Sequence, residues 1–213
     1  IHKDSKMKKS IWTAALALIL LAAAPLKAQQ KENLKQIEDY LNNIKTMQAA
    51  FVQTASNGNT AEGMLYIAKP NKIRMEYNPP ADVQIIGDGD YIVYYDKELD
   101  QVTNIDYDDI PASLILANDV KLDGKKFKVS NYYHDAGITT VTIQYKDKGD
   151  IGPITLTFNN NPFELKQWSI VDPQSVEVTV SLYNAQKDID LDKSLFKFKK
   201  AKSGPKSYNK GRR

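Results

Sequence analysis

The chain has 213 residues, with 29 Lys and Arg, 26 Asp and Glu, 2 His, no Cys and a formal charge of +3. Hydrophobic residues make up 42% of it, which suits one globular domain or at most a small pair. The absence of cysteine excludes a disulfide framework, a thiol nucleophile and a Cys-ligated zinc site, and two histidines are too few for a His-rich metal site.

The first 28 residues follow the plan of a secretory signal peptide. Lys8 and Lys9 follow Met7, an apolar stretch covers residues 11–24, and Ala28 precedes polar glutamines. The apolar stretch, about 14 residues long, is too short to span a bilayer, which needs roughly 20. We expect residues 1–6 to be untranslated and cleavage to follow Ala28, with cleavage after Ala24 as the alternative.

A helix is predicted over residues 31–51. Apolar side chains recur there at steps of three and four, with Lys, Glu, Asp and Asn on the other face. They are Leu34, Ile37, Leu41, Ile44 and Phe51.

From Val52 the hydrophobic period changes to two, which indicates short strands. Strands are predicted over residues 63–68, 72–77, 83–87, 91–95 and 99–104. Residues 111–118, PASLILAN, predict a short apolar helix because proline favours a first helical turn. Strands resume over residues 127–133, 139–145, 154–159, 165–171 and 176–183.

Frequent turns between these strands favour hairpins, so we expect one curved antiparallel sheet. Its apolar face needs a cover, and the two predicted helices are the available apolar elements. They serve either as a permanent core or as a reversible lid.

The tail of the chain differs from its body in charge. Residues 197–213 hold eight basic and no acidic residues, which leaves residues 29–196 with a net charge of −9. We expect residues 199–213 to be disordered, and either simply solvated or in contact with anionic phospholipid headgroups. The acidic body argues against nucleic-acid binding.

Side chains that could perform catalysis lack a convincing arrangement. His134 has no nucleophile that the sequence places near it. Paired aspartates such as Asp88 and Asp90 could form a hydrolase pair, but beside glycine they are more typical of tight turns.

One ordered string of motifs runs through the chain. It consists of residues 63–77 (GMLYIAKPNKIRMEY), Pro80, residues 85–89 (IIGDG), residues 94–96 and 99–102, Phe51, Gln53, Pro111, Leu114, Leu116 and residues 195–198 (LFKF). Together these motifs resemble the LolA family, and the resemblance covers nearly all of residues 30–198.

The resemblance implies a mainly β fold with helices (α+β): an unclosed antiparallel half-barrel whose apolar concave face is covered by helices acting as a lid. Residues 29–198 would form this domain. The implied function is that of a monomeric periplasmic chaperone, not an enzyme and without cofactor or metal, that sequesters the acyl chains of lipoproteins. It would receive them from an ATP-driven inner-membrane release complex like LolCDE and pass them to LolB where that acceptor exists. The alternative is a LolA-like periplasmic module that senses lipid or binds a protein.

The side chains expected to line the lipid-binding cavity, if they are not plain core, are Leu65, Ile67, Ile73, Met75, Tyr77, Val93, Tyr95, Leu114 and Leu116. The family often has Arg where Lys69 stands, and there it links the sheet to the lid. Lysine lacks the planar fork for bidentate bonding, so a weaker lid latch that retains cargo is our hypothesis. Arg74 matches a family Arg, although a surface ion pair would explain it as well.

Overall fold

The computed structural model describes residues 28–122, 124–148, 151–172 and 174–200. The predicted signal peptide, apart from Ala28, and most of the predicted basic tail lie outside these residues.

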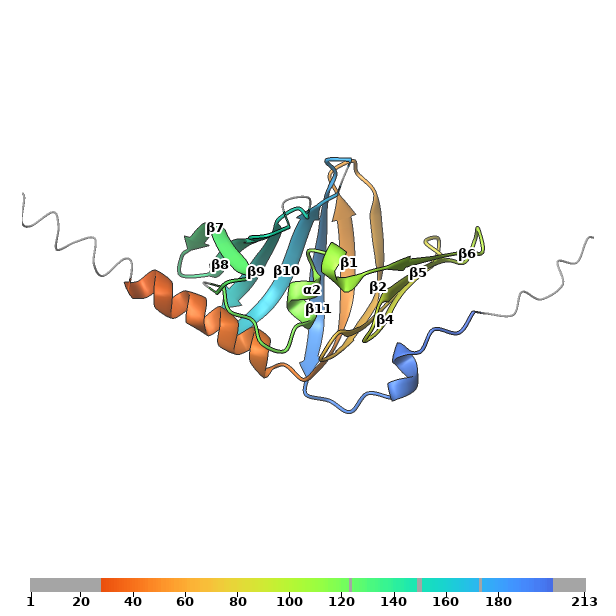
Figure 1. Ribbon diagram of the computed structural model, residues 1–213, viewed down its shortest axis with the longest axis horizontal. Coiled ribbons are helices and arrows are strands. Elements are labelled where there is room, and N and C mark those ends of the chain that lie inside the picture. The colour runs from red at the N-terminus through yellow and green to blue at the C-terminus, as the bar shows by residue number, and fades with distance from the viewer. Residues whose placement is uncertain (1–27, 123, 149–150, 173, 201–213) are drawn as a thin grey trace, which may run out of the picture.

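The described residues form one eleven-stranded antiparallel sheet that does not close into a barrel (Figure 1). Its spatial order is β6-β5-β4-β3-β2-β1-β11-β10-β9-β8-β7. The expected fold class is thus confirmed. The strands are β1 (Thr46–Ala55), β2 (Thr60–Ala68), β3 (Lys72–Tyr77), β4 (Val83–Asp88), β5 (Ile92–Asp96), β6 (Gln101–Ile105), β7 (Phe127–His134), β8 (Ile138–Tyr145), β9 (Ile154–Asn160), β10 (Phe163–Val171) and β11 (Glu177–Lys187).

One helix of four turns and three single-turn segments accompany the sheet in the part of the chain that is described. An N-terminal helix covers residues 28–43. The others are the 3-10 helix η1 (Tyr107–Asp109), the single-turn α2 (Ser113–Leu116) inside the predicted 111–118 helix, and the 3-10 helix η2 (Lys193–Phe196).

The predicted helix over residues 31–51 is wrong in its second half. The helix ends at residue 43, and β1 begins at Thr46. Met47, Ala49 and Phe51 are buried at steps of two, while the residues between them are only partly buried. Because β1 pairs with β2 on one side and β11 on the other, non-local hydrogen bonding overrides the helix propensity of Met, Gln and Ala. The ten predicted strands each match an observed strand, β2 to β11, with ends that differ by a few residues at most.

The inner face of the sheet, defined here as the face that carries Met47, Leu65 and Met75, holds the hydrophobic core. Directly paired residues share a face, and Leu65 pairs with both Ala49 and Met75. The N-terminal helix and α2 cover this face (Figure 1). Ile37 and Leu41 of the helix join the same buried cluster. The apolar face therefore has the helical cover that the sequence leads us to expect.

The rings of Phe51 and Tyr77 meet across a glycine on the strand between them. Gly63 pairs with Phe51 on one side and with Tyr77 on the other. The two rings stand edge to face with centroids 5.1 Å apart. A Cβ at Gly63 would lie 1.9 Å from the backbone oxygen of Glu76 and 3.0 Å from Cε1 of Phe51. Only glycine leaves room for this contact.

We therefore expect Gly63→Ala to lower the free energy of unfolding by about 2–3 kcal/mol, because the added methyl displaces backbone as well as a packed ring. Urea denaturation followed by far-UV circular dichroism measures the change. Gly137→Ala is the matched control, since its Cβ would meet only Asp135 Oδ1, at 3.6 Å. Equal stability of the two variants would contradict the conclusion that Gly63 has no room for a side chain.

Candidate functional site

An apolar cavity of about 170 Å³ lies between the inner face and the segment that leads into α2. Two distant parts of the sheet, β3–β6 and β10–β11, contribute to its walls, so the sheet must curve around it. On a flat sheet β5 and β10 would lie about 28 Å apart, six strand spacings. The residues that line the cavity are Gln53, Ile73, Met75, Tyr77, Ile85, Ile92, Tyr94, Ile105, Ile110, Ala112, Ser113, Leu116, Trp168, Ile170, Val178 and Val180.

Two of the polar side chains in the cavity wall, Tyr77 and Ser113, are hydrogen-bonded to other side chains. The Tyr77 hydroxyl donates to Gln53 Oε1 at 2.7 Å, and the Ser113 and Tyr145 hydroxyls lie 2.7 Å apart. Burial, together with the neighbouring Tyr94, raises the pKa of Tyr77 to about 12, so this phenol stays neutral at physiological pH. The cavity therefore offers its contents an uncharged, mostly hydrocarbon surface, as apolar ligands require.

The nine predicted cavity residues fall into three groups. Ile73, Met75, Tyr77 and Leu116 line the cavity. Leu65, Ile67 and Leu114 are buried in the adjoining core and do not line it. Val93 and Tyr95 lie on the opposite, outer face of the sheet.

The outer placement of Val93 and Tyr95 corrects the sequence prediction and follows from strand register. Val93 pairs with Ile86 and Tyr95 with Gln84, on the face that also carries Arg74. Their neighbours Ile92 and Tyr94 point into the cavity instead. Every residue from Ile92 to Tyr95 is apolar or aromatic, so this strand shows no alternation that would reveal its inner side.

Sequence reasoning also missed the wall contributed by β10 and β11. Val178 and Val180 alternate at steps of two and could have been recognised by parity. Trp168 could not, because a register shift between Leu165 and Gln167 changes which side chains face inward.

Lys69, the predicted latch, joins the sheet to both covering helices. Its Nζ donates to the carbonyl oxygen of Leu41 at 2.5 Å, in the last turn of the N-terminal helix. It also donates to the carbonyl oxygen of Ala117 at 2.9 Å, at the end of α2. The last carbonyls of a helix lack partners within it and carry partial negative charge, so one ammonium group satisfies two helix ends.

The loop after α2 is tied to the N-terminal helix by polar contacts of its own. Asn42 exchanges two hydrogen bonds with the backbone of Val120, at 2.8 and 3.0 Å. Glu38 Oε1 accepts from the backbone of Leu122 at 2.6 Å. The helix and this loop are therefore connected to each other as well as to Lys69.

The other side chains considered for catalysis have structural roles. His134 Nδ1 lies 2.7 Å from Thr139 Oγ1, which in turn donates to Asn160 Oδ1. Asp88 Oδ1 accepts the backbone N–H of Asp90 at 3.1 Å, which supports the interpretation of these aspartates as turn residues. Among the described helices, none is long and apolar enough to cross a membrane.

Comparison with known proteins gives a family match over most of the chain. The family model described as "Outer membrane lipoprotein carrier protein LolA" matches residues 42–199. An outer-membrane lipoprotein carrier protein of Leptothrix cholodnii is 26% identical over 179 residues, which is 79% of this chain and 82% of the relative. One of Shewanella sp. (strain MR-7) is 25% identical over 90% of this chain and 92% of its own length.

Two further matches extend over similar lengths. An uncharacterized protein of Rickettsia prowazekii is 29% identical over 91% of this chain and 88% of its own length. Among solved structures, a LolA superfamily protein from Nitrosomonas europaea superposes with a TM-score of 0.47 at 7% identity, over 79% of this chain and 97% of the other.

The environment of Lys69 makes stability depend on pH. Burial, and to a lesser extent the charge of Lys45, lowers the pKa of Lys69 from 10.5 to about 8. Between pH 8 and 10.5 the unfolded chain therefore binds a proton that the folded chain lacks, so this group makes stability rise with pH over that window.

We expect the free energy of unfolding of the natural protein to rise relative to Lys69→Arg from pH 8 to 10.5, because arginine stays protonated throughout. The relative gain should be about 1–2 kcal/mol, less than the full pKa shift implies, because the half-buried ammonium is partly screened. Urea unfolding of both proteins across this range measures it. Parallel pH profiles would contradict the pKa assignment.

Proposed function

Because this chain belongs to the LolA family, we propose that it is a periplasmic carrier that moves lipoproteins from the inner to the outer membrane. Their acyl chains would occupy the cavity on the inner face. The donor would be an ATP-driven release complex of the inner membrane, and the acceptor a LolB-type receptor where one exists. The protein would act as a monomer and without chemical catalysis.

The apolar cavity is the observation that carries this proposal. Its wall holds no charged residue, and the hydroxyls of Tyr77 and Ser113 are hydrogen-bonded to other side chains. Hydrocarbon gains about 0.8 kcal/mol per buried methylene, so a segment of about twelve methylenes would gain roughly 10 kcal/mol. That gain suits a ligand whose affinity comes from chain length.

The size of the cavity implies that its cover must move when cargo enters. The cavity measures about 170 Å³, whereas pockets that enclose ligands usually measure about 300–1,000 Å³. Room for an acyl chain would come from displacing the segment around α2 and the N-terminal helix. The hydrogen bonds that hold these elements closed, including the two from Lys69, then compete with cargo, which keeps binding reversible.

A release assay tests the carrier function. The protein from Gln29 to Arg213 is added to spheroplasts that synthesise a labelled outer-membrane lipoprotein and contain the native release complex. We expect the label to enter the supernatant in a one-to-one complex with the protein. Absence of the label, with the protein folded, would favour the alternative of a lipid-sensing or protein-binding module.

A cavity-filling substitution links the release to the cavity. Ala112 lines the cavity, and Ala112→Leu adds three carbons to its wall, whereas Ala136→Leu makes the same change at an exposed turn. We expect Ala112→Leu to lower the released label about fivefold or more, since overfilling costs about 1–3 kcal/mol. Ala136→Leu should release as much as the natural protein, and equal release by both variants would place the cargo elsewhere.

Lys69→Arg tests the latch hypothesis separately. A guanidinium has five N–H donors and can hold the carbonyls of Leu41 and Ala117 more firmly than an ammonium. We expect a three- to tenfold weaker affinity for a fluorescent acyl probe, since about one added hydrogen bond would stabilise the closed state. The same substitution at exposed Lys35 is the control. Equal probe retention by the natural protein and Lys69→Arg would disprove the latch hypothesis.

A further inference from the structure

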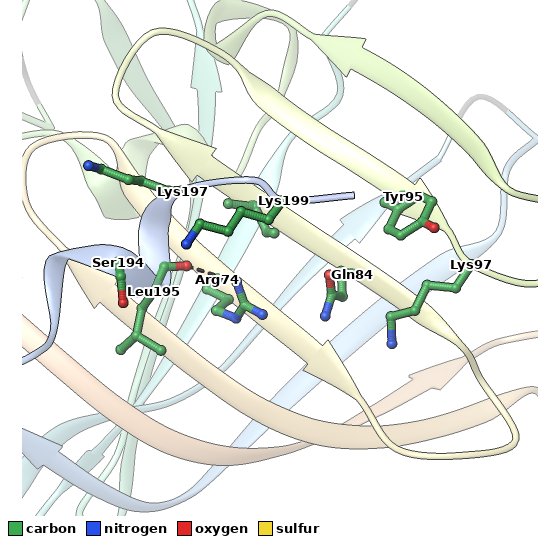
Figure 2. Close-up of a pocket in the computed structure, with 9 residues that line it drawn as sticks. Arg74, Gln84, Tyr95, Lys97, Ser194, Leu195, Lys197 and Lys199 are labelled. Carbon is green, nitrogen blue, oxygen red and sulfur yellow. Dashed lines mark hydrogen bonds between the residues drawn. The ribbon is translucent and has the colours of Figure 1, made fainter. Parts of the chain in front are cut away.

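A second cavity, a groove of about 340 Å³, lies on the outer face, away from the apolar cavity. Strands β3–β5 form its floor, and the C-terminal strap, defined here as residues 192–200, runs along it (Figure 2). Four of its nine lining residues are basic: Arg74, Lys97, Lys197 and Lys199. The apolar cavity on the inner face, by contrast, has no charged lining residue.

The strap is fixed to the sheet by specific contacts. Arg74 Nη1 donates to the carbonyl oxygen of Leu195 at 2.9 Å. Phe196 is buried, and the ring of Phe198 meets that of Tyr95 edge to face with centroids 5.4 Å apart. The groove is thus held in shape by fixed contacts between its two sides, the sheet and the C-terminal strap.

The groove keeps a surplus of positive charge after its ion pairs are counted. Arg74 pairs with Glu76, whose Oε1 also accepts from Gln84 Nε2 at 3.4 Å, and Lys97 pairs with Asp82 at 2.6 Å. Lys199 has no carboxylate within salt-bridge distance among the described residues. In Figure 2 Lys199 extends from the strap toward Arg74, and Lys97 extends toward Gln84. Lys197 points in the opposite direction.

Arg74 also keeps one donor without a partner. Its Nε is buried and has no hydrogen-bond partner among the described residues. A buried polar group left unpaired costs about 1–3 kcal/mol, so it needs an explanation. A ligand oxygen that enters the groove and shifts the guanidinium would provide one, since Nε is closed to solvent in this structure.

We propose that this outer groove binds a phosphate-type oxyanion, with Arg74, Lys97, Lys199 and Gln84 as its donors. A planar guanidinium flanked by ammonium and amide donors is the arrangement that recognises phosphate oxygens. The volume admits more than a bare phosphate, so a phospholipid headgroup or a small phosphorylated solute both fit this chemistry. All charged residues beyond the strap are basic, which favours an anionic ligand. This inference does not rest on the proposed carrier function.

The test follows the backbone NMR signals of Gln84 and Tyr95 in the protein from Gln29 to Arg213 at low salt. Inorganic phosphate and glycerol phosphate are titrated, and vesicles of phosphatidylcholine, pure or equimolar with phosphatidylglycerol, are tested by flotation. We expect saturable shifts of the groove signals with at least one phosphate probe. Response to soluble phosphates alone identifies a solute site, whereas flotation with the anionic vesicles identifies a headgroup site.

Matched variants separate the groove from general charge. Lys97→Gln with Lys199→Gln should weaken binding of the responding probe about tenfold or more, since a hydrogen bond to a charged group contributes about 1.5–3 kcal/mol. Lys35→Gln with Lys121→Gln removes the same amount of charge at two exposed ion pairs away from the groove and should change binding less than twofold. Gln84→Glu, which places a carboxylate in the groove, should weaken binding as well. Absence of any probe response, or equal losses in the groove and control pairs, would overturn the proposal.

Discussion

The pairing of β1 with β11 is the contact on which the rest of the structure depends. The strands from β1 to β6 and from β7 to β11 each follow one another as hairpins, and each hairpin pairs segments close in sequence. Among the described strands, only the β1–β11 pair joins the two series, through a register that runs from Met47 with Lys187 to Ala55 with Val178. Without it, β3–β6 and β10–β11 could not share the walls of one cavity.

An open sheet of this kind leaves its apolar face to be covered by something other than strands. The N-terminal helix and α2 provide that cover, and the carbonyl groups at the ends of both accept hydrogen bonds from Lys69. The apolar contacts exclude water, while the hydrogen bonds fix where the helices sit. A cover held this way can be displaced without unpairing any strand, which is what the proposed carrier function requires.

The two faces of strands β3–β5 have different chemistry because side chains alternate across a strand. On β3, Ile73 and Met75 face the apolar cavity, and Arg74 between them faces the basic groove. The same few residues thus bring a hydrocarbon surface and a cationic surface within the thickness of one sheet. The C-terminal strap completes the second surface by adding Lys199 and by packing Phe198 on Tyr95.

The sequence by itself determined most of the strands, the turns between them, the helical cover and the family. These follow from hydrophobic period, turn residues and a local motif around Lys69, all of which act over a few residues. Tertiary structure decided where the first helix stops, because β1 forms only when β2 and β11 flank it. It also decided that Tyr94 faces the cavity while Val93 and Tyr95 face outward, and that Trp168 joins the wall. In each case the inner side of a strand depends on its register with a neighbour, and a uniformly apolar run or a bulge leaves that register undetermined until the strands pair.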